Sequence, residues 1–191
     1  MINKELKMSK LTIFFFSSVL SMMSYVCTAQ TQDEAAIHQL FSNYMEKYNF
    51  YIQTGVLQHK PALYSQEVMV LSDSRAPRVV TESVLYSQIE VFLDSLKKRG
   101  VTKVNWQKVD IHMLGSNMAL VSNIAIRYNK HGNVIDRVGA SYTIYKHDEE
   151  WRISSFAIHN ANNAFRFNPI VENQNGKLGR LSTDYSSASK Q

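Results

Sequence analysis

Cysteine, proline and glycine are all scarce in this 191-residue chain, with one, three and seven residues respectively. This composition is neither collagen-like nor that of a disordered chain. Charged residues make up 19% of the sequence and hydrophobic residues 45%, as in globular proteins. Removal of an N-terminal leader would leave about 160 residues, which is typical of one domain with one hydrophobic core.

Motifs that would indicate cofactor or metal chemistry are also absent from the sequence. It has no glycine-rich phosphate loop and no Gly-x-Ser-x-Gly elbow, so nucleotide use and serine hydrolysis have no support. Its six histidines form no pair at metal-ligand spacing with an acidic partner. The basic excess is small, and the one basic run, residues 97–99, lies where a helix is expected to end. We therefore expect no cofactor, no metal ion and no nucleic-acid partner.

The N-terminal 29 residues have the order of parts of a secretory signal peptide. Three lysines lie within residues 1–10, an apolar run spans residues 11–23, and Cys27-Thr28-Ala29 precedes Gln30. The apolar run is shorter than the ~20 residues that span a bilayer, and no second such run follows it. We therefore expect cleavage after Ala29, no stable membrane span, and a periplasmic or secreted protein.

Cys27 leaves one alternative open, in which it becomes the acylated first residue of a lipoprotein. Tyr25 and Val26 argue against this alternative, because they are bulky where lipoprotein leaders have small residues. Cleavage after Ala29 instead leaves a mature chain without cysteine, and therefore without a disulfide or a thiol nucleophile. The formal charge of +5 then falls to +3, because the leader holds three lysines and one glutamate.

Apolar spacing divides the rest of the chain into helices followed by strands. Residues 31–48 and 81–100 repeat apolar residues at helical spacing, and residues 50–60 continue as a short second helix or turn. From Val101 onward the period changes to two, which is typical of strands. One short strand and four longer antiparallel strands are expected at residues 68–71, 103–113, 118–129, 134–146 and 151–160. The pattern predicts an α+β domain over residues 30–160, followed by a polar C-terminal tail over residues 161–191.

Four short sequence segments lie at the first strand, at one hairpin and in the last two strands of this order of elements. They are Ser-Gln-Glu-Val-Met-Val at 65–70, Asn-Lys-His-Gly-Asn at 129–133, Asp-Arg to Tyr-Thr-Ile-Tyr at 136–145 and Glu-Trp-Arg-Ile at 150–153. Together they resemble the nuclear transport factor 2-like superfamily, in particular its SnoaL-like domains. The resemblance implies a cone-shaped domain, with N-terminal helices packed on a strongly curved, mainly antiparallel sheet around a ligand pocket. It also implies a homodimer through the sheet, but it assigns no function, because members include both enzymes and binding modules.

The resemblance suggests where catalytic groups would lie. Ketosteroid isomerase-like members pair a tyrosine in the first helix with one acid at the first strand and a second acid deep in the sheet. Here Tyr44 or Tyr48 could supply the phenol, and Asp73 follows the first strand. Asp136 stands at the beginning of a strand, and no acidic residue lies in the middle of the last three strands. The candidate bases are therefore Asp73, Asp136 and His159, without the acid pair of the isomerases.

A turn at residues 130–133 sets the register of the two strands that it joins. It places Arg127 opposite Asp136, and it places Asn123 and Tyr142 on the same face as that pair. Small residues separate these polar groups, which leaves room for a ligand. The alternative is that this face is the solvated outside of the sheet, with Arg127 and Asp136 as an ordinary surface ion pair.

Extension of the register through the next hairpin pairs Ser155 with Tyr142 and His159 with Val138. His159 would then join the same polar face, where an imidazole is suited to proton transfer. The candidate ligand pocket comprises Tyr44, Tyr48, Asn123, Arg127, Tyr142 and His159. For the two helix tyrosines, core packing is the alternative, because they recur at helical spacing.

Two functions remain open. One is an exported, non-enzymatic module that binds a small apolar molecule or associates through its sheet. The other is a cofactor-independent isomerase, dehydratase or hydrolase that acts by proton transfer on a small apolar substrate. In the second, His159, Asp136 or Asp73 is the base and a tyrosine is the donor. The missing acid pair favours the binding module.

Overall fold

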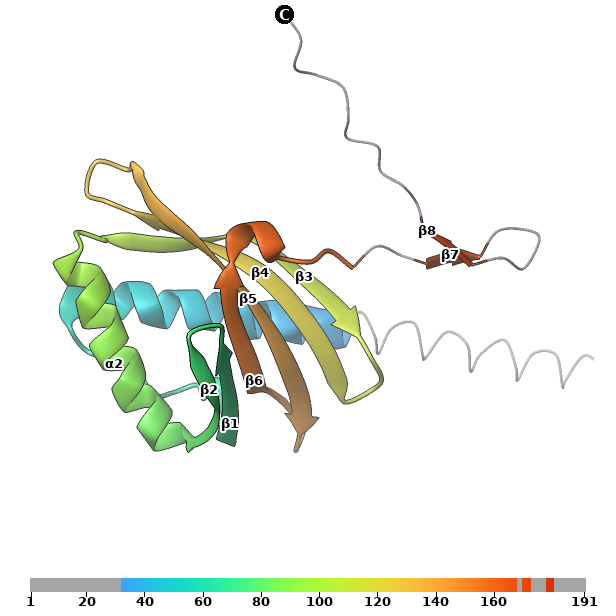
Figure 1. The fold of residues 1–191 in the computed structure, drawn as a ribbon. Coiled ribbons are helices and arrows are strands. Elements are labelled where there is room, and N and C mark those ends of the chain that lie inside the picture. Colours follow the sequence, from blue (N-terminus) through green and yellow to red (C-terminus); the bar gives the residue numbers. More distant parts are fainter. Residues whose placement is uncertain (1–31, 168–169, 173–177, 181–191) are drawn as a thin grey trace, which may run out of the picture.

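A curved sheet of six strands forms the body of the molecule (Figure 1). The computed structural model describes residues 32–167, 170–172 and 178–180, so the predicted leader, with Cys27 and its cleavage site, lies outside the described residues. The strands are β1 (Tyr64–Ser72), β2 (Arg75–Thr81), β3 (Lys103–Met113), β4 (Met118–Tyr128), β5 (Val134–His147) and β6 (Glu150–Asn160). In the order β2-β1-β6-β5-β4-β3, β1 and β6 are parallel and the other neighbours are antiparallel.

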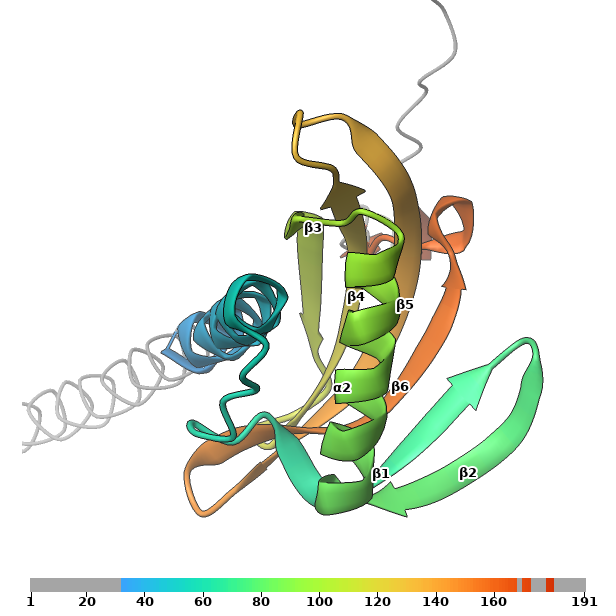
Figure 2. The same ribbon diagram turned by 90° about the vertical axis from the view of Figure 1, so that its left-hand side faces the viewer.

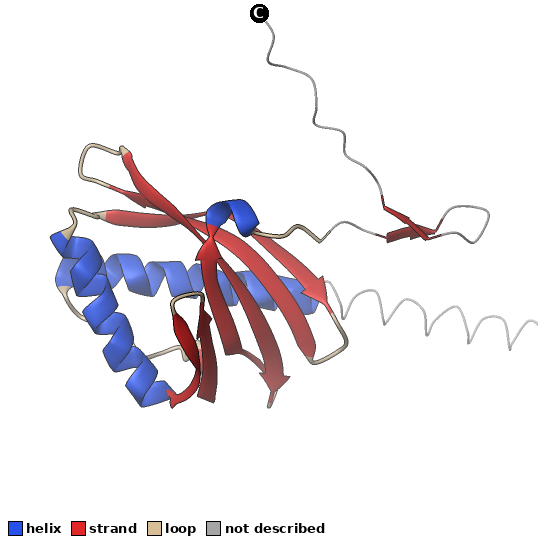
Figure 3. Ribbon diagram, in the orientation of Figure 1, coloured by secondary structure: helices blue, strands red, loops and turns tan. Residues whose placement is uncertain are grey.

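The four long strands β3 to β6 begin and end within one residue of their predicted positions. β1 is longer than predicted, and β2 was not predicted. β2 is an edge strand that contains Pro77 and is mostly exposed, so its sequence shows no alternation of buried and exposed residues. With the helices on one side, this arrangement confirms the predicted α+β class and the curved, mainly antiparallel sheet (Figure 3).

The first helix runs through residues 32–54 without interruption. The predicted break into two helices was therefore wrong, and the helix ends only at Gly55, whose positive φ of 77° suits glycine. Its buried side chains recur at helical spacing and include Ile37, Leu40, Phe41 and Met45. Within the described part of the chain, no helix is long and apolar enough to cross a membrane.

The second helix, α2 (Glu82–Lys98), begins and ends where the sequence places its caps. The Thr81 side chain accepts a hydrogen bond from the Val84 backbone N–H, and Gly100 follows the helix with a φ of 84°. One face of α2 is buried, through Leu85, Tyr86, Ile89, Leu93 and Leu96. Figure 2 shows α2 and the first helix on the same, concave side of the sheet.

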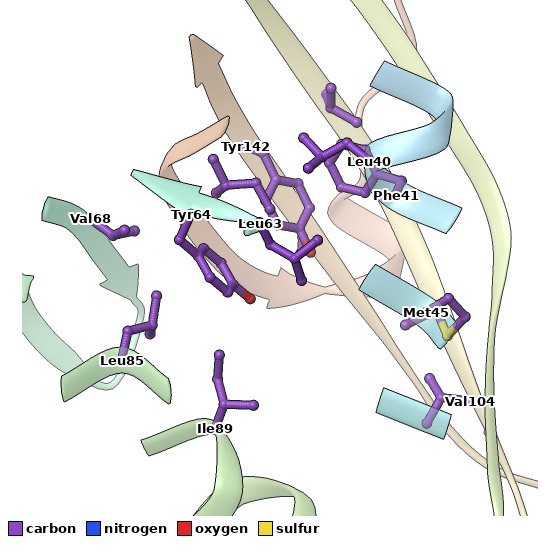
Figure 4. Packing of buried hydrophobic residues seen from close by; sticks show 14 of the residues in the cluster. Leu40, Phe41, Met45, Leu63, Tyr64, Val68, Leu85, Ile89, Val104 and Tyr142 are labelled. Carbon is purple, nitrogen blue, oxygen red and sulfur yellow. The ribbon is translucent and has the colours of Figure 1, made fainter. Parts of the chain in front are cut away.

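The hydrophobic core lies between the two helices and the concave face. Phe41 of the first helix meets the Tyr142 ring of β5 edge-on, with ring centroids 5.0 Å apart. In Figure 4, Leu85 and Ile89 of α2 lie on the side of the core opposite Phe41, and Tyr64 lies between. This packing buries the apolar stripes of both helices against the sheet, which is the main stabilising contribution in such a fold.

An asparagine of the first helix bonds to the edge of the sheet. Asn49 Nδ2 donates to the Val104 carbonyl oxygen at 2.8 Å, and the Val104 N–H donates to Asn49 Oδ1 at 2.8 Å. β3 is an edge strand, so these two groups have no neighbouring strand to pair with. The side-chain amide takes the place of that strand at one residue and ties the helix to the sheet.

The first residues of the predicted polar tail fold back onto the sheet. The short 3-10 helix η1 (Ala161–Asn163) follows β6, and the Phe167 ring stacks on His112 of β3 with centroids 5.0 Å apart. Beyond it, β7 (Ile170–Glu172) and β8 (Leu178–Arg180) pair as a small antiparallel sheet that the sequence pattern did not predict.

We predict that Asn49→Ala lowers the free energy of unfolding by about 1–3 kcal/mol, because it leaves the buried Val104 N–H and C=O without partners. Urea unfolding measures the change. The matched control is Asn43→Ala on the same helix, where the side chain only accepts a bond from exposed Gln39. That change should stay within about 0.5 kcal/mol. Equal effects of the two substitutions would contradict the structural role of Asn49.

Candidate functional site

Four tyrosines from three elements meet inside the cone. They form the tyrosine cluster, which comprises Tyr44 and Tyr48 of the first helix, Tyr64 of β1 and Tyr142 of β5. The Tyr44 hydroxyl donates to the Tyr48 hydroxyl at 3.0 Å, and their ring centroids lie 4.4 Å apart. The Tyr44 centroid lies 6.2 Å from that of Tyr64 and 6.4 Å from that of Tyr142. The cluster therefore brings several phenol groups into one largely apolar interior.

Asn123 of β4 is a further polar group on this face. It is only 2% exposed, and neither its Nδ2 nor its Oδ1 makes a hydrogen bond of good geometry. The Tyr142 phenol lies beside it, and the amide acts to lower the pKa of that phenol against the larger effect of burial. Its neighbours on the same face of the sheet are the small residues Ala125, on the same strand, and Ala140, directly across on β5. A buried amide without partners costs about 1–3 kcal/mol per unsatisfied group, so its presence here requires an explanation.

Burial raises the pKa of every tyrosine in the cluster above the ordinary value of 10.0. In each case the largest cause is the loss of hydration, which penalises the charged phenolate. The pKa values of Tyr44, Tyr64 and Tyr142 lie well above 10.0, and charge repulsion from a neighbouring tyrosine raises each of them further. At neutral pH these groups are therefore neutral phenols, which can donate hydrogen bonds to a ligand but cannot take up a proton as bases.

The predicted pairing of Arg127 with Asp136 is confirmed by the strand register. Arg127 Nη1 lies 3.2 Å from Asp136 Oδ2, and Arg99 at the end of α2 reaches the same oxygen at 3.1 Å. The Arg127 guanidinium also lies over the Phe92 ring, 5.3 Å from its centroid. Two arginines thus hold the Asp136 carboxylate, and the group ties the end of α2 to the sheet.

The predicted position of His159 was wrong by one residue. The structure pairs His159 with Gly139 instead of Val138, and Tyr142 with Phe156 instead of Ser155. The cause is a β-bulge at Ser154, where β6 has one extra residue relative to β5. A one-residue shift moves every following side chain to the opposite face, so His159 lies on the convex face, away from the tyrosine cluster.

The candidate bases do not converge. Asp73 is exposed in the turn between β1 and β2, Asp136 is held by arginines, and His159 faces the other side of the sheet. Of the candidate pocket residues, the structure brings Tyr44, Tyr48, Asn123 and Tyr142 to the interior and places Arg127 with its ion pair and His159 elsewhere. Whether they bind a ligand stays a prediction.

Sequence reasoning missed Tyr64 as a member of the cluster. The predicted first strand began at Val68, whereas β1 begins at Tyr64. Both residues are buried, but Gln66 between them is exposed and the pairing with β6 is irregular there, so the period-two pattern does not reach Tyr64. Within the described residues, no group of three acidic, histidine or cysteine side chains is placed to hold a metal ion.

A surface groove of about 500 Å³ lies between the first helix and β3. Its walls come from the first helix and from the edge strand, and they include the apolar residues Phe41, Met45 and Val109 as well as polar ones such as His38, Glu46 and Asn105. It is shallow and open to solvent, and the tyrosine cluster does not line it.

A family model described as NTF2-like protein (DUF6841) matches residues 10–161 of the chain. The match begins inside the predicted leader and ends one residue beyond the predicted domain. A search of the curated proteins found no match.

Solved structures share the fold at low sequence identity. A domain of unknown function with a cystatin-like fold from Nostoc punctiforme is 17% identical, with a TM-score of 0.51 over 68% of this chain and 78% of that one. Two proteins from Novosphingobium aromaticivorans are each 10% identical with TM-scores of 0.51. One is described as a putative scytalone dehydratase, with coverage of 74% and 91%, and one as an NTF2-like protein, with coverage of 78% and 89%.

We predict that the tyrosine cluster makes the fold sensitive to alkali. Its pKa values are raised in the folded state, so the stability they contribute is complete below about pH 10 and is lost as pH rises above it. Each tyrosine contributes a slope of up to about 1.4 kcal/mol per pH unit. Absorbance at 295 nm should show these phenols ionising together with unfolding, and Tyr142→Phe should lessen the slope. Ionisation of the cluster in a chain that stays folded would contradict this.

Proposed function

This chain belongs to the NTF2-like protein family, and we propose that it binds a small, largely apolar molecule in the interior of its cone. The ligand class follows from the walls of the interior. Aromatic rings dominate them, and the polar groups are neutral phenols and one amide. An aromatic or alicyclic molecule with a single carbonyl or hydroxyl group fits this chemistry.

The observation that carries the proposal is the buried amide of Asn123, which lies beside Tyr142 but makes no hydrogen bond of good geometry. A buried polar group without a partner weakens the folded protein, and sites that bind ligands are where such groups gain partners. A ligand carbonyl would accept a hydrogen bond from Asn123 Nδ2, and a ligand hydroxyl would donate one to Oδ1. The two alanines beside Asn123 add little bulk at this point of the sheet.

The positions of the ionisable groups favour binding over proton transfer. An isomerase, dehydratase or hydrolase acting inside the cone would need a base within hydrogen-bonding reach of its substrate. Asp136 is engaged by Arg99 and Arg127, and His159 is on the convex face. The phenols are neutral because burial raises their pKa values, as for Tyr142. These groups support a site that orients a ligand by hydrogen bonds.

We predict that Asn123→Leu stabilises the unliganded protein by about 1–3 kcal/mol and abolishes ligand binding, because it replaces an unsatisfied amide by an apolar group of similar shape. Urea unfolding measures the first effect. Thermal shift with a panel of small aromatic ketones and phenols, together with mass spectrometry of molecules that copurify, measures the second. The proposal fails if the wild-type protein binds no panel member and carries no copurifying molecule.

A pair of tyrosines on one strand provides a matched control for the binding assay. Tyr142 faces the interior, whereas Tyr145 on the same strand is 43% exposed, and its hydroxyl accepts a bond from Asn117. Tyr142→Phe should weaken binding of a panel member by about 5- to 10-fold, as expected for one lost hydrogen bond. Tyr145→Phe should leave the affinity unchanged. Equal losses in both variants would place the ligand outside the cone.

We also propose that the protein is exported by its N-terminal leader and works in the periplasm or outside the cell. When the full chain is expressed in bacteria, the mature protein should begin at Gln30 and appear in the periplasm or the medium. Cys27→Ser should leave processing unchanged. Acylation of the wild-type chain, with processing blocked by Cys27→Ser, would instead identify a lipoprotein.

A further inference from the structure

A serine and a histidine meet on the convex face of the sheet, away from the proposed ligand interior. Ser141 of β5 and His159 of β6 lie with Oγ and Nε2 2.9 Å apart. The other ring nitrogen, Nδ1, lies 2.8 Å from the backbone carbonyl oxygen of Asn160. Both side chains are only partly buried, so a small molecule in solution can reach them.

The partners of the imidazole define the direction of both hydrogen bonds. A carbonyl oxygen can only accept, so Nδ1 carries the ring proton and donates it to Asn160 O. In a neutral imidazole, Nε2 is then unprotonated and accepts a hydrogen bond, which the Ser141 hydroxyl donates. This is the arrangement of an activated nucleophile, in which a base bonds to the hydroxyl and a third group orients the base.

Gly139 makes room for this arrangement. It stands directly opposite His159 on β5. A Cβ at position 139 would lie less than 3.0 Å from two atoms of the imidazole ring and 2.9 Å from the Asn160 carbonyl oxygen. No residue with a side chain could occupy this position while the ring lies across the strand toward Ser141. The glycine therefore allows the geometry of the pair.

A pocket of about 380 Å³ lies one strand away from the pair, and neither Ser141 nor His159 lines it. Ser122 of β4, directly opposite Ser141 on the neighbouring strand, lines this pocket, and the segment that follows β6 covers it. Its walls are mixed in character and include Lys108, Asp110, Ile124, Asn162 and Phe165. Neighbouring strands are about 4.8 Å apart, so a molecule held there would have its end within reach of Ser141.

We propose that Ser141 is a nucleophile and His159 its general base in a second site that hydrolyses small carboxylic esters. Ser141 Oγ bonds to the ester carbonyl carbon while its proton passes to His159 Nε2. The carbon–oxygen bond to the alcohol then breaks, and the alcohol leaves with that proton. Water attacks the acyl-serine and gives a proton to Nε2, the carboxylic acid leaves, and the proton returns to Ser141 Oγ. No cofactor or oxidant is required.

Labelling with a fluorophosphonate tests the nucleophile. Ser141 Oγ displaces fluoride from phosphorus and its proton passes to the base, so intact mass and peptide mapping of the whole chain should locate one adduct at Ser141. Ser141→Ala should abolish labelling, and His159→Asn should slow it about 100-fold, within the usual contribution of a general base. The control is Ser155→Ala, a serine of β6 on the same face. It should label at the wild-type rate.

Hydrolysis of p-nitrophenyl acetate tests turnover and should follow the same order among the variants. Circular dichroism should show all of them folded. Labelling and hydrolysis do not depend on whether any panel member binds in the interior, so failure of one proposal is distinguishable from failure of the other. An adduct at another residue, no adduct in the wild-type protein, or wild-type labelling in folded His159→Asn would overturn the assignment.

Gly139→Ala tests the positioning of the base. The added methyl group should displace the imidazole and slow labelling of Ser141 about as much as His159→Asn does. Nitrogen-15 NMR of the histidine rings provides a readout that a general loss of stability does not move. In the wild-type protein the His159 proton should reside on Nδ1, and Gly139→Ala should remove this tautomer preference. An unchanged His159 signal in the variant would contradict the role of the glycine.

Discussion

Packing of the first helix across the concave side of the sheet is the interaction on which the rest of this structure depends. Phe41 lies against Tyr142, and its backbone carbonyl accepts a hydrogen bond from the Trp106 indole at 2.9 Å. The same helix contributes two members of the tyrosine cluster and the asparagine that bonds to β3. The helix thus covers the interior, supplies two of its four phenols and binds the edge strand.

The long strands could be predicted because their turns are polar and their period of two is uninterrupted, as between β4 and β5, where Arg127 and Asp136 face each other as expected. Asn123 and Tyr142 were placed correctly on one face for the same reason. His159 could not be placed, because the extra residue at Ser154 leaves no mark in the pattern of apolar residues. The backbone hydrogen bonds between β5 and β6 determine the face on which His159 lies, and the sequence alone does not show them.

The bulge at Ser154 determines which side chains of β6 lie on each face of the sheet. Before the bulge Ile153 faces the concave side, and after it Phe156 does so as well, which keeps the interior aromatic and apolar. The residues that would otherwise have entered the cone, among them His159, turn outward. The interior is therefore left with neutral hydrogen-bonding groups, while the ionisable imidazole meets a hydroxyl on the outside.

The bond between Asn49 and Val104 also bears on how copies of this chain can associate. Unpaired edge strands attract strands of other molecules, and extended sheets of this kind lead to aggregation. At Val104 the N–H and C=O that an incoming strand would require are already occupied by a side-chain amide. A strand from another molecule would have to displace the first helix before it could extend the sheet at Val104.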